Sequence, residues 1–425
     1  MEFTDIEHTA SAENMAANGG PGDWKGVNPF DPNYRDNPYP GINALRVSDP
    51  VNLTPVNTWR ISRFDDIAHV LKNAKTSQTL SNGVSPGFDP LDKRGSFLDF
   101  MLNKDGAEHA RLRQIVIRSL NMKTVRKMEG AVEDTVKEVM GKAIKNGGMD
   151  IVKNLAMIVP SRMVCTILGI PPEDREMFDD LTALRTNAFF GRFLPPEVQV
   201  LTRQAGSDMA DYFEKMVADK RLNLGDDLVS QLIISADEDG TISDYDLVVQ
   251  TIGLIIAGFE TTIGLIGNGV RALIEHPDQL QLLREDPTRV NAAVEEVLRY
   301  DTPIHFIWRV LTEPFELDGK VLPKDAVLWL QLAAGNHDPQ RFVNPGAFDI
   351  LRENNANEAF GGGAHFCLGN QLARMEARHA LRALSEYTRD FDIDADAIQW
   401  SPSFFRVMAH YPVTFKAPKT SLYPR

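Results

Sequence analysis

The chain has 425 residues, 43% of them hydrophobic, and a formal net charge of −14. A chain of this length and composition can bury a large core, and its negative charge argues against nucleic acid or an anionic membrane as the main partner. It contains two cysteines, Cys165 and Cys367, which excludes a disulfide framework and is typical of a protein in the reducing cytoplasm. No apolar run follows Met1, so we expect no signal peptide.

In chain order, residues 1–25 come first and are polar and rich in glycine and alanine, which predicts a disordered segment. Residues 26–425 contain no internal repeat and no low-complexity linker, so we expect them to form one domain. Their apolar residues recur mostly at helical spacing, and strand-like runs, such as residues 327–330, are short. The sequence therefore predicts a mainly α fold with small β-sheets.

Two further segments are distinctive by composition. Residues 79–94 are rich in serine, glycine, proline and aspartate and predict a mobile loop of the kind that often contains a binding site. Residues 247–270 are apolar enough for a membrane span, but they contain Gln250, Glu260 and Asn268, which favour a buried central helix. We therefore expect no membrane-spanning segment.

Residues 257–262, with the sequence AGFETT, place a carboxylate and two threonines in this apolar helix. A buried carboxylate is costly unless it has a partner or water, and a threonine hydroxyl can bond to the carbonyl four residues earlier and bend the helix. With Gly258, Glu260 and Thr261 predict a local opening of the helix that holds water or a small ligand. A solvent-facing Glu260 and ordinary helical threonines explain the same residues equally well.

Residues 360–369, with the sequence FGGGAHFCLG, form a glycine-rich loop that presents Cys367 at the start of a predicted helix. Gly361 and Gly363 permit positive φ and leave room above the loop for a flat ligand. Because the thiol lies where the first N–H groups of the helix point, we expect a lowered thiol pKa and a thiolate that binds a metal. Cys165 lies on an apolar helix and is expected to be an ordinary core residue.

Two pairs of charged residues lie at helical spacing. Glu296 and Arg299 are three residues apart, and His109 and Arg113 are four residues apart, so each pair shares one face of a helix. Taken alone, both pairs are equally typical of solvated helix faces.

Together these segments resemble the cytochrome P450 family. Residues 360–369 match its pattern F-G-x-G-x-H-x-C-x-G in full, residues 257–262 match A-G-x-[DE]-T-T, and residues 296–299 match E-x-x-R. The similarity extends over about residues 60–415, through five motifs in the family's order. It implies a triangular, mainly helical prism with small sheets, and it implies that the protein binds haem b.

The resemblance also implies roles for individual residues. Cys367 would be the metal ligand, as the axial thiolate of the haem iron. Glu260 and Thr261 would be catalytic, the first relaying protons and the second steadying dioxygen and its water. The other cofactor contacts would be His109, Arg113, Arg309 and His365 to the haem propionates, with Phe360 and Gly361 in the loop.

The resemblance makes Glu296 and Arg299 a structural ion pair behind the haem. A third arginine often joins this pair in the family, and Ala347 lies where that arginine is common. The sequence leaves open whether Arg352 replaces it or whether the network has two members.

By similarity of position, apolar side chains from several segments would line the substrate pocket. They predict an aromatic-lined pocket and a neutral hydrophobic substrate such as a terpenoid, aromatic or polycyclic molecule, although Arg192 and Arg406 would also suit an acidic substrate. The expected pocket residues are Phe88, Phe97, Phe189, Phe190, Phe193, Ile256, Ala257, Ile304, Phe306, Ile307, Phe405, Val407 and Met408.

These expectations combine into a haem-thiolate monooxygenase that inserts one oxygen atom of O2 into an apolar small molecule, by hydroxylation or epoxidation. Its electrons would come from a small 2Fe–2S ferredoxin and its reductase, as in soluble bacterial members of the family. A haem-thiolate peroxygenase or isomerase is an alternative, against which Glu260 and Thr261 argue. A non-enzymatic haem protein that only binds ligands is another, against which the lack of an output domain argues.

Overall fold

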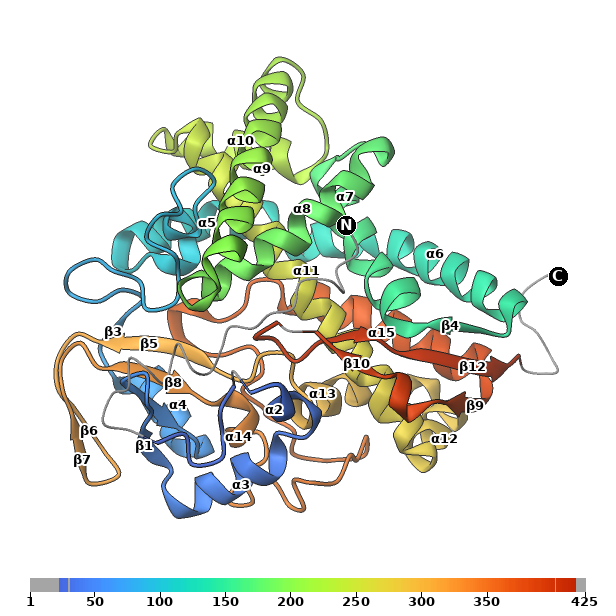
Figure 1. The fold of residues 1–425 in the computed structure, drawn as a ribbon. Helices are drawn as coiled ribbons and strands as arrows, with labels where there is room; N and C mark the ends of the chain where they lie inside the picture. The colour runs from blue at the N-terminus through green and yellow to red at the C-terminus, as the bar shows by residue number, and fades with distance from the viewer. Residues whose placement is uncertain (1–22, 30, 402, 418–425) are drawn as a thin grey trace.

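The computed structural model describes residues 23–29, 31–401 and 403–417. Most of the segment predicted to be disordered, residues 1–25, lies outside the described residues. Within them, the prediction of a mainly α fold with small β-sheets is confirmed (Figure 1).

Helices make up most of the described chain. The α-helices are α2 (Pro32–Asp36), α3 (Tyr39–Ser48), α4 (Phe64–Asn73), α5 (Gly106–Ser119), α6 (Met122–Asn146), α7 (Ile158–Leu168), α8 (Arg175–Thr186), α9 (Pro196–Leu222), α10 (Leu228–Asp239), α11 (Asp244–Glu275), α12 (Pro277–Glu285), α13 (Val290–Tyr300), α14 (Leu332–Gly335) and α15 (Asn370–Tyr387). Shorter helical turns cover Phe97–Asp99, Met101–Asn103, Val152–Ala156, Pro172–Asp174, Asn187–Phe193, Pro287–Arg289, Gly363–His365 and Ala395–Ala397.

The strands form small sheets beside the helices. The largest has the order β1-β2-β8-β5-β3; β2 and β8 are parallel, and its other pairs are antiparallel. In a second sheet β12 lies between β4 and β9, and β6–β7 and β10–β11 form two-stranded ribbons. The strands are β1 (Val51–Leu53), β2 (Thr58–Ile61), β3 (Thr76–Ser77), β4 (Gly148–Asp150), β5 (Ile307–Leu311), β6 (Phe315–Leu317), β7 (Lys320–Leu322), β8 (Val327–Leu330), β9 (Arg389–Ile393), β10 (Gln399–Trp400), β11 (Met408–His410) and β12 (Pro412–Lys416).

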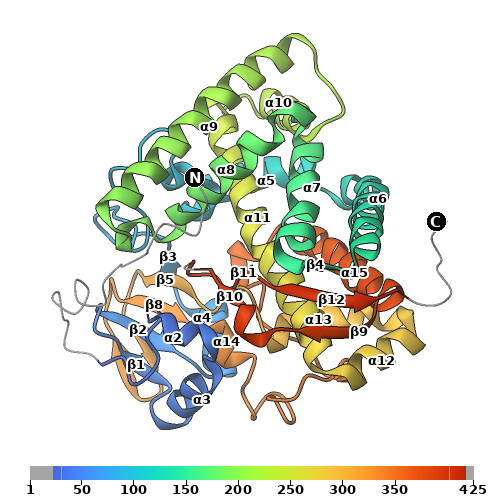
Figure 2. The same cartoon turned by 45° about the vertical axis from the view of Figure 1, so that its right-hand side comes forward.

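The long helix α11 crosses the middle of the molecule (Figures 1 and 2). It begins with a capping box, in which the side chains of Ser243 and Asp246 each accept a hydrogen bond from the other residue's backbone N–H. At Gly253, a Cβ would lie 2.2 Å from the Phe100 ring, so only glycine allows this ring to pack on the helix. The helix is long and apolar enough to cross a membrane, but 72% of its most apolar window is buried. That burial is expected of a core helix.

Figure 2 shows two unequal parts on either side of this helix. The sheet that contains β1, β2, β5 and β8 lies with α2 to α4 at the lower left, whereas α8 to α10 lie above and α6 and α7 to the right. The helix α15 packs directly against α11, α6 and α13. The cavity described below lies where α11, α15 and the large sheet meet.

The loop predicted over residues 79–94 contains no helix or strand. The fully buried side chain of Arg185, on α8, donates a hydrogen bond to Asp92 in this loop (2.6 Å). Arg203, on α9, forms an ion pair with Asp89. The loop is therefore anchored to both helices.

Candidate active site

A cavity of about 300 Å³ lies against the middle of α11. Its walls come from α11, α15, the segment 303–309 that leads into β5, and the cysteine loop 360–369. Apart from the cysteine loop and α15, which are consecutive, these elements are far apart in the chain, so the cavity exists only in the folded molecule. Most of its lining side chains are apolar.

The cysteine loop forms one wall of the cavity. The backbone N–H of Cys367 donates to the Phe360 carbonyl (3.1 Å), which closes the loop. Gly361 and Gly363 have φ values of 64° and 69°, as predicted. These positive angles turn the chain so that Phe360, Gly361 and Cys367 all line the cavity.

The thiol of Cys367 has a raised pKa, and the prediction of a lowered pKa is wrong. Burial raises the pKa, and the N–H groups of Gly369 and Asn370 and the charge of Arg113 only partly oppose the rise. Removal of the thiol from water thus outweighs its position at the start of α15. The same N–H groups and Arg113 would stabilise a thiolate bound to a metal ion.

The four predicted propionate contacts line one edge of the cavity. The rings of His109 and His365 pack with their centroids 4.0 Å apart, and His365 Nε2 lies 3.6 Å from Asp105. Burial, then the charges of His365 and Arg113, lower the pKa of His109 to about 4, and burial lowers the pKa of Arg309 to about 10. The charge of an anionic ligand would oppose both shifts, because it favours the protonated forms.

Gln78 lies at the same edge, and sequence reasoning missed it. Its backbone N–H donates to Asp105 (2.8 Å), and its side-chain nitrogen is buried with no hydrogen-bond partner among the described residues. The pairing of β3 with β5, Ser77 opposite Val310, places Gln78 across from Arg309. A thiol on one wall, basic groups and an unpaired donor at one edge, and apolar walls elsewhere fit a haem with its two carboxylates.

Glu260 and Thr261, although adjacent on α11, have different surroundings. Thr261 lines the cavity and donates from Oγ1 to the Ala257 carbonyl (2.8 Å). Glu260 does not line it and is hydrogen-bonded to Ser403. Burial raises the pKa of Glu260 to about 7, and the bond to Ser403 opposes the rise.

The predicted local opening of α11 is wrong, because the helix continues without a break from Asp244 to Glu275. A Cβ at Gly258 would meet no atom within 4 Å. The space for a small ligand or water therefore lies in the cavity beside the helix. Gly258 lines the cavity, and because it has no side chain it leaves this space open.

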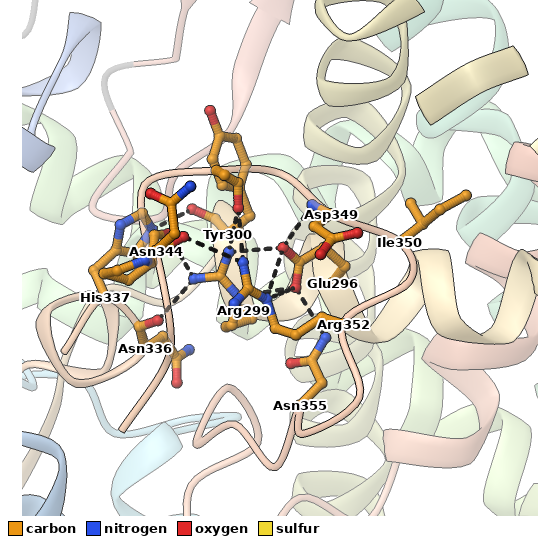
Figure 3. A network of polar contacts seen from close by, with 12 residues as sticks. Glu296, Arg299, Tyr300, Asn336, His337, Asn344, Asp349, Ile350, Arg352 and Asn355 are labelled. Carbon is orange, nitrogen blue, oxygen red and sulfur yellow. Dashed lines mark hydrogen bonds and ion pairs between the residues drawn. The ribbon is translucent and has the colours of Figure 1, made fainter. Parts of the chain in front are cut away.

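Glu296 is fully buried at the centre of a polar network (Figure 3). Arg299 donates to both of its carboxylate oxygens, at 2.8 and 2.7 Å, and Arg352 donates from Nε to the same two oxygens, at 3.1 and 3.2 Å. Arg352 is thus the third member that the sequence left open. Ala347 contributes its carbonyl, which accepts from both arginines.

Seven of the thirteen predicted pocket residues line the cavity, and six do not. The lining residues are Phe189, Phe190, Ala257, Ile304, Phe306, Ile307 and Phe405. The predictions that need correction are Phe88, Phe97, Phe193, Ile256, Val407 and Met408, none of which is among the lining side chains.

Packing explains most of these corrections. Phe88 and Phe97 lie behind Phe189, with ring centroids 6.4 and 4.8 Å from it. Val407 and Met408 pack against glycines of α11, where a Cβ would lie 3.0 and 3.4 Å from them. Ile256 is fully buried on another face of α11.

Glu376, on α15, lines the cavity and was missed. It is 2% exposed, and one of its carboxylate oxygens has no hydrogen-bond partner among the described residues. Burial raises its pKa to about 8. Leu372 and Ala373, four and three residues earlier, line the same wall, so helical spacing from the cysteine loop would have indicated its direction.

Arg406 does not face the cavity and is not available to an acidic substrate. It is buried and donates from Nε to Asp301 (3.1 Å). Arg192 is exposed on the surface and does not line the cavity either.

Comparison with known proteins identifies the family. A model of the cytochrome P450 family matches residues 51–390. The cytochrome P450 monooxygenase PikC of Streptomyces venezuelae is 34% identical over 381 residues, 87% of this chain and 89% of PikC. The 6-deoxyerythronolide B hydroxylase of Saccharopolyspora erythraea is 32% identical over 382 residues, 86% of this chain and 92% of that enzyme. The crystal structure of CalO2 has a TM-score of 0.84 at 32% identity and covers 92% of this chain and 99% of CalO2.

The chain therefore belongs to the cytochrome P450 family. Membership confirms the fold that the motifs predicted and makes the protein an enzyme of the monooxygenase class. It also implies a haem-thiolate cofactor, which the chemistry of the cavity fits.

Proposed function

We propose that this protein is a haem b monooxygenase that inserts one oxygen atom of O2 into an apolar small molecule, by hydroxylation or, less often, epoxidation. The second oxygen atom takes up two protons and leaves as water. A small 2Fe–2S ferredoxin with its reductase supplies the two electrons. We place the enzyme in the cytoplasm and take residues 26–425 as one catalytic domain.

One observation supports this proposal above the others: Cys367, Thr261 and four basic side chains converge on one cavity. Cys367 would hold the haem iron through its thiolate, and His109, Arg113, Arg309 and His365 would bind the haem carboxylates, with Gln78 as a further donor. When bound, the haem supplies the oxidising chemistry, which a thiolate ligand favours. The chain supplies the ligand, the protons and the shape of the cavity.

Glu260 and Thr261 deliver the protons in this proposal. A pKa of about 7 lets Glu260 hold and release a proton at neutral pH. Thr261 donates its own hydroxyl hydrogen to Ala257, which leaves its oxygen able to accept a hydrogen bond in the cavity. Peroxide-driven oxidation and isomerisation do not need proton delivery to dioxygen. The positions of Glu260 and Thr261 therefore favour a monooxygenase over a peroxygenase or an isomerase.

The substrate is proposed to be neutral and hydrophobic. Phe189, Phe190, Phe306 and Phe405 line the cavity with aromatic rings, and Arg406 is paired elsewhere. One relative is a hydroxylase of 6-deoxyerythronolide B, and the aromatic walls of this cavity fit a substrate with an extended apolar surface.

The experiment that tests this function is an optical study of the purified holoprotein. The ferric protein is titrated with a panel of terpenoids, aromatics, steroids and fatty acids, and a shift from low-spin to high-spin haem identifies compounds that fit. The protein is then reduced under carbon monoxide, once with dithionite and once with a 2Fe–2S ferredoxin, its reductase and reduced nicotinamide cofactor. We expect the thiolate-type carbon monoxide spectrum in both cases.

Each part of the proposal has its own contrary result. A carbon monoxide spectrum without the thiolate signature would reject Cys367 as the ligand and the function with it. A thiolate spectrum with dithionite but with no ferredoxin system would reject the electron donor. A spin shift only with charged fatty acids would reject the neutral substrate.

A further inference from the structure

A buried charged cluster centred on Asp301 lies directly behind the cavity wall. Asp301 accepts hydrogen bonds from the Tyr39 hydroxyl (2.7 Å) and from Arg406 Nε (3.1 Å), and its other carboxylate oxygen lies 3.7 Å from Arg271. Burial alone would raise the pKa of Asp301, but Arg406, Arg271 and Tyr39 together hold it below the ordinary value. Asp301 is therefore a charged group in a dry site, and Arg406 is its closest cation.

The cluster ties the segment 301–307 to residues 405–406 and ties both to α11. The backbone N–H of Arg406 donates to the Pro303 carbonyl (2.7 Å). The Asn268 side chain, on α11, donates to the carbonyls of Asp301 and Arg406, each at 3.0 Å. A Cβ at Gly264 would lie 2.9 Å from Pro303, so the segment 301–307 packs directly on the backbone of α11.

Residues next to the cluster in the chain line the cavity. Phe405, which lines the cavity, precedes Arg406. Ile304 and Phe306, which also line it, flank His305, and His305 Nδ1 is hydrogen-bonded to the Tyr34 hydroxyl at 2.9 Å. A displacement of either segment would therefore change the width of the cavity between Phe405 and the segment 303–307.

We propose that Asp301 and Arg406 are a positioning pair that fixes the distance between the segment 303–307 and Phe405, and so sets which substrates fit. The inference rests on the proposed monooxygenase function. A charged hydrogen bond has a preferred distance and angle, whereas apolar side chains can slide past one another. Loss of the Asp301 charge would leave the Arg406 guanidinium buried without a counter-charge, and the segment would have to move to admit water.

The test is the Asp301→Asn variant, which keeps the shape of the side chain and removes its charge. The ferric holoprotein is titrated with imidazole and with clotrimazole; both bind through one azole nitrogen, but clotrimazole also has three aryl rings that must fit between the walls. We expect the dissociation constant of clotrimazole to change by about tenfold or more, the size of effect seen when a ligand no longer matches the shape of an apolar pocket. The dissociation constant of imidazole should stay within about twofold of the wild-type value.

Asp338→Asn is the matched control. Asp338 is a buried carboxylate that faces Arg46 (3.9 Å), and neither residue lines the cavity. The ratio of the two dissociation constants should stay at its wild-type value in this variant. If Asp301→Asn takes up no haem, the double variant Asp301→Asn with Arg406→Met, which leaves no unpaired charge, gives the same readout.

The outcomes separate this inference from the proposed function. An unchanged clotrimazole-to-imidazole ratio in a variant with a normal thiolate carbon monoxide spectrum would overturn the positioning role alone. An equal change in the Asp338→Asn control would overturn it too, since the effect would then follow from any lost buried charge. A wild-type protein without the thiolate spectrum would overturn the proposed function and this inference together.

Discussion

At the scale of single residues, the clearest contrast is between Thr261 and Thr251. Each lies on α11 and donates its hydroxyl to the carbonyl four residues earlier, at 2.8 Å, but only Thr261 lines the cavity. We expect Thr261→Ala to keep consuming oxygen while the product formed per O2 falls by about tenfold or more, because proton delivery fails. Oxygen uptake and product are measured together with a substrate found in the optical titration.

Thr251→Ala removes the same intrahelical bond outside the cavity and should leave product per O2 at the wild-type value. Unchanged coupling in Thr261→Ala would reject its role in proton delivery. Equal uncoupling in both variants would show that the intrahelical bond matters and the cavity-facing oxygen does not.

At the scale of elements, the Glu296 network joins α13 to the segment that leads into the cysteine loop. Glu296 is fully buried and bonded to Arg299 and Arg352, so Glu296→Gln would leave two buried guanidinium groups without a counter-charge. We expect this variant to lose about 3 kcal/mol of stability. The loss is measured as a shift of the urea midpoint of the holoprotein.

Glu295→Gln is the control for this prediction. Glu295 is the next residue of α13 and pairs with Arg374, but both side chains are partly exposed. Loss of the Glu295 charge should lower the free energy of unfolding by less than about 1 kcal/mol, because solvent weakens the ion pair and hydrates Arg374 once it is unpaired. Equal losses in the two variants would contradict the structural role assigned to the buried network.

At the scale of the whole molecule, a buried acid makes stability depend on pH. Burial raises the pKa of Glu376 from 4.5 to about 8. Between these values the folded protein holds a proton that the unfolded chain releases, so stability falls as pH rises, by at most about 1.4 kcal/mol per pH unit. We expect Glu376→Gln to flatten this fall between about pH 5.5 and 7.5, measured by chemical unfolding at several pH values.

Glu386→Gln on the same helix is a suitable control, since Glu386 pairs with Arg382 near the surface. It should keep the slope of the wild-type protein. If the stability of Glu376→Gln also fell with pH as steeply as that of the wild-type protein, the carboxyl of Glu376 would be ionised in the folded protein.

Local sequence chemistry was enough to predict the elements that carry the site. The apolar run and the capping residues define α11, and the glycines of the cysteine loop require the positive φ values that the structure has. The resemblance to the cytochrome P450 family added His109, Arg113, Arg309, His365 and Thr261 to the predicted Cys367, and all six residues line the cavity. These features depend on residues close together in the chain.

The rest was decided by contacts between distant segments. Gln78 reaches Arg309 only through the pairing of β3 with β5, and Arg352 reaches Glu296 only through the course of the segment after α14. Phe88 and Phe97 pack against Phe189, which lines the cavity, and do not line it themselves. Which aromatic ring lines a cavity and which lies behind it depends on the packing of elements, and the sequence does not encode that packing locally.

The pKa of Cys367 shows the same division. The sequence alone determined that the thiol precedes a helix, where N–H groups favour a thiolate. Only the tertiary structure determined that the thiol is partly buried, and this loss of solvation raises its pKa more than those groups lower it. The sequence by itself thus determined the family and predicted Cys367 and the basic residues that line the cavity, whereas the fold decided the shape of the cavity and the solvation of its charges, because both depend on which distant segments exclude water.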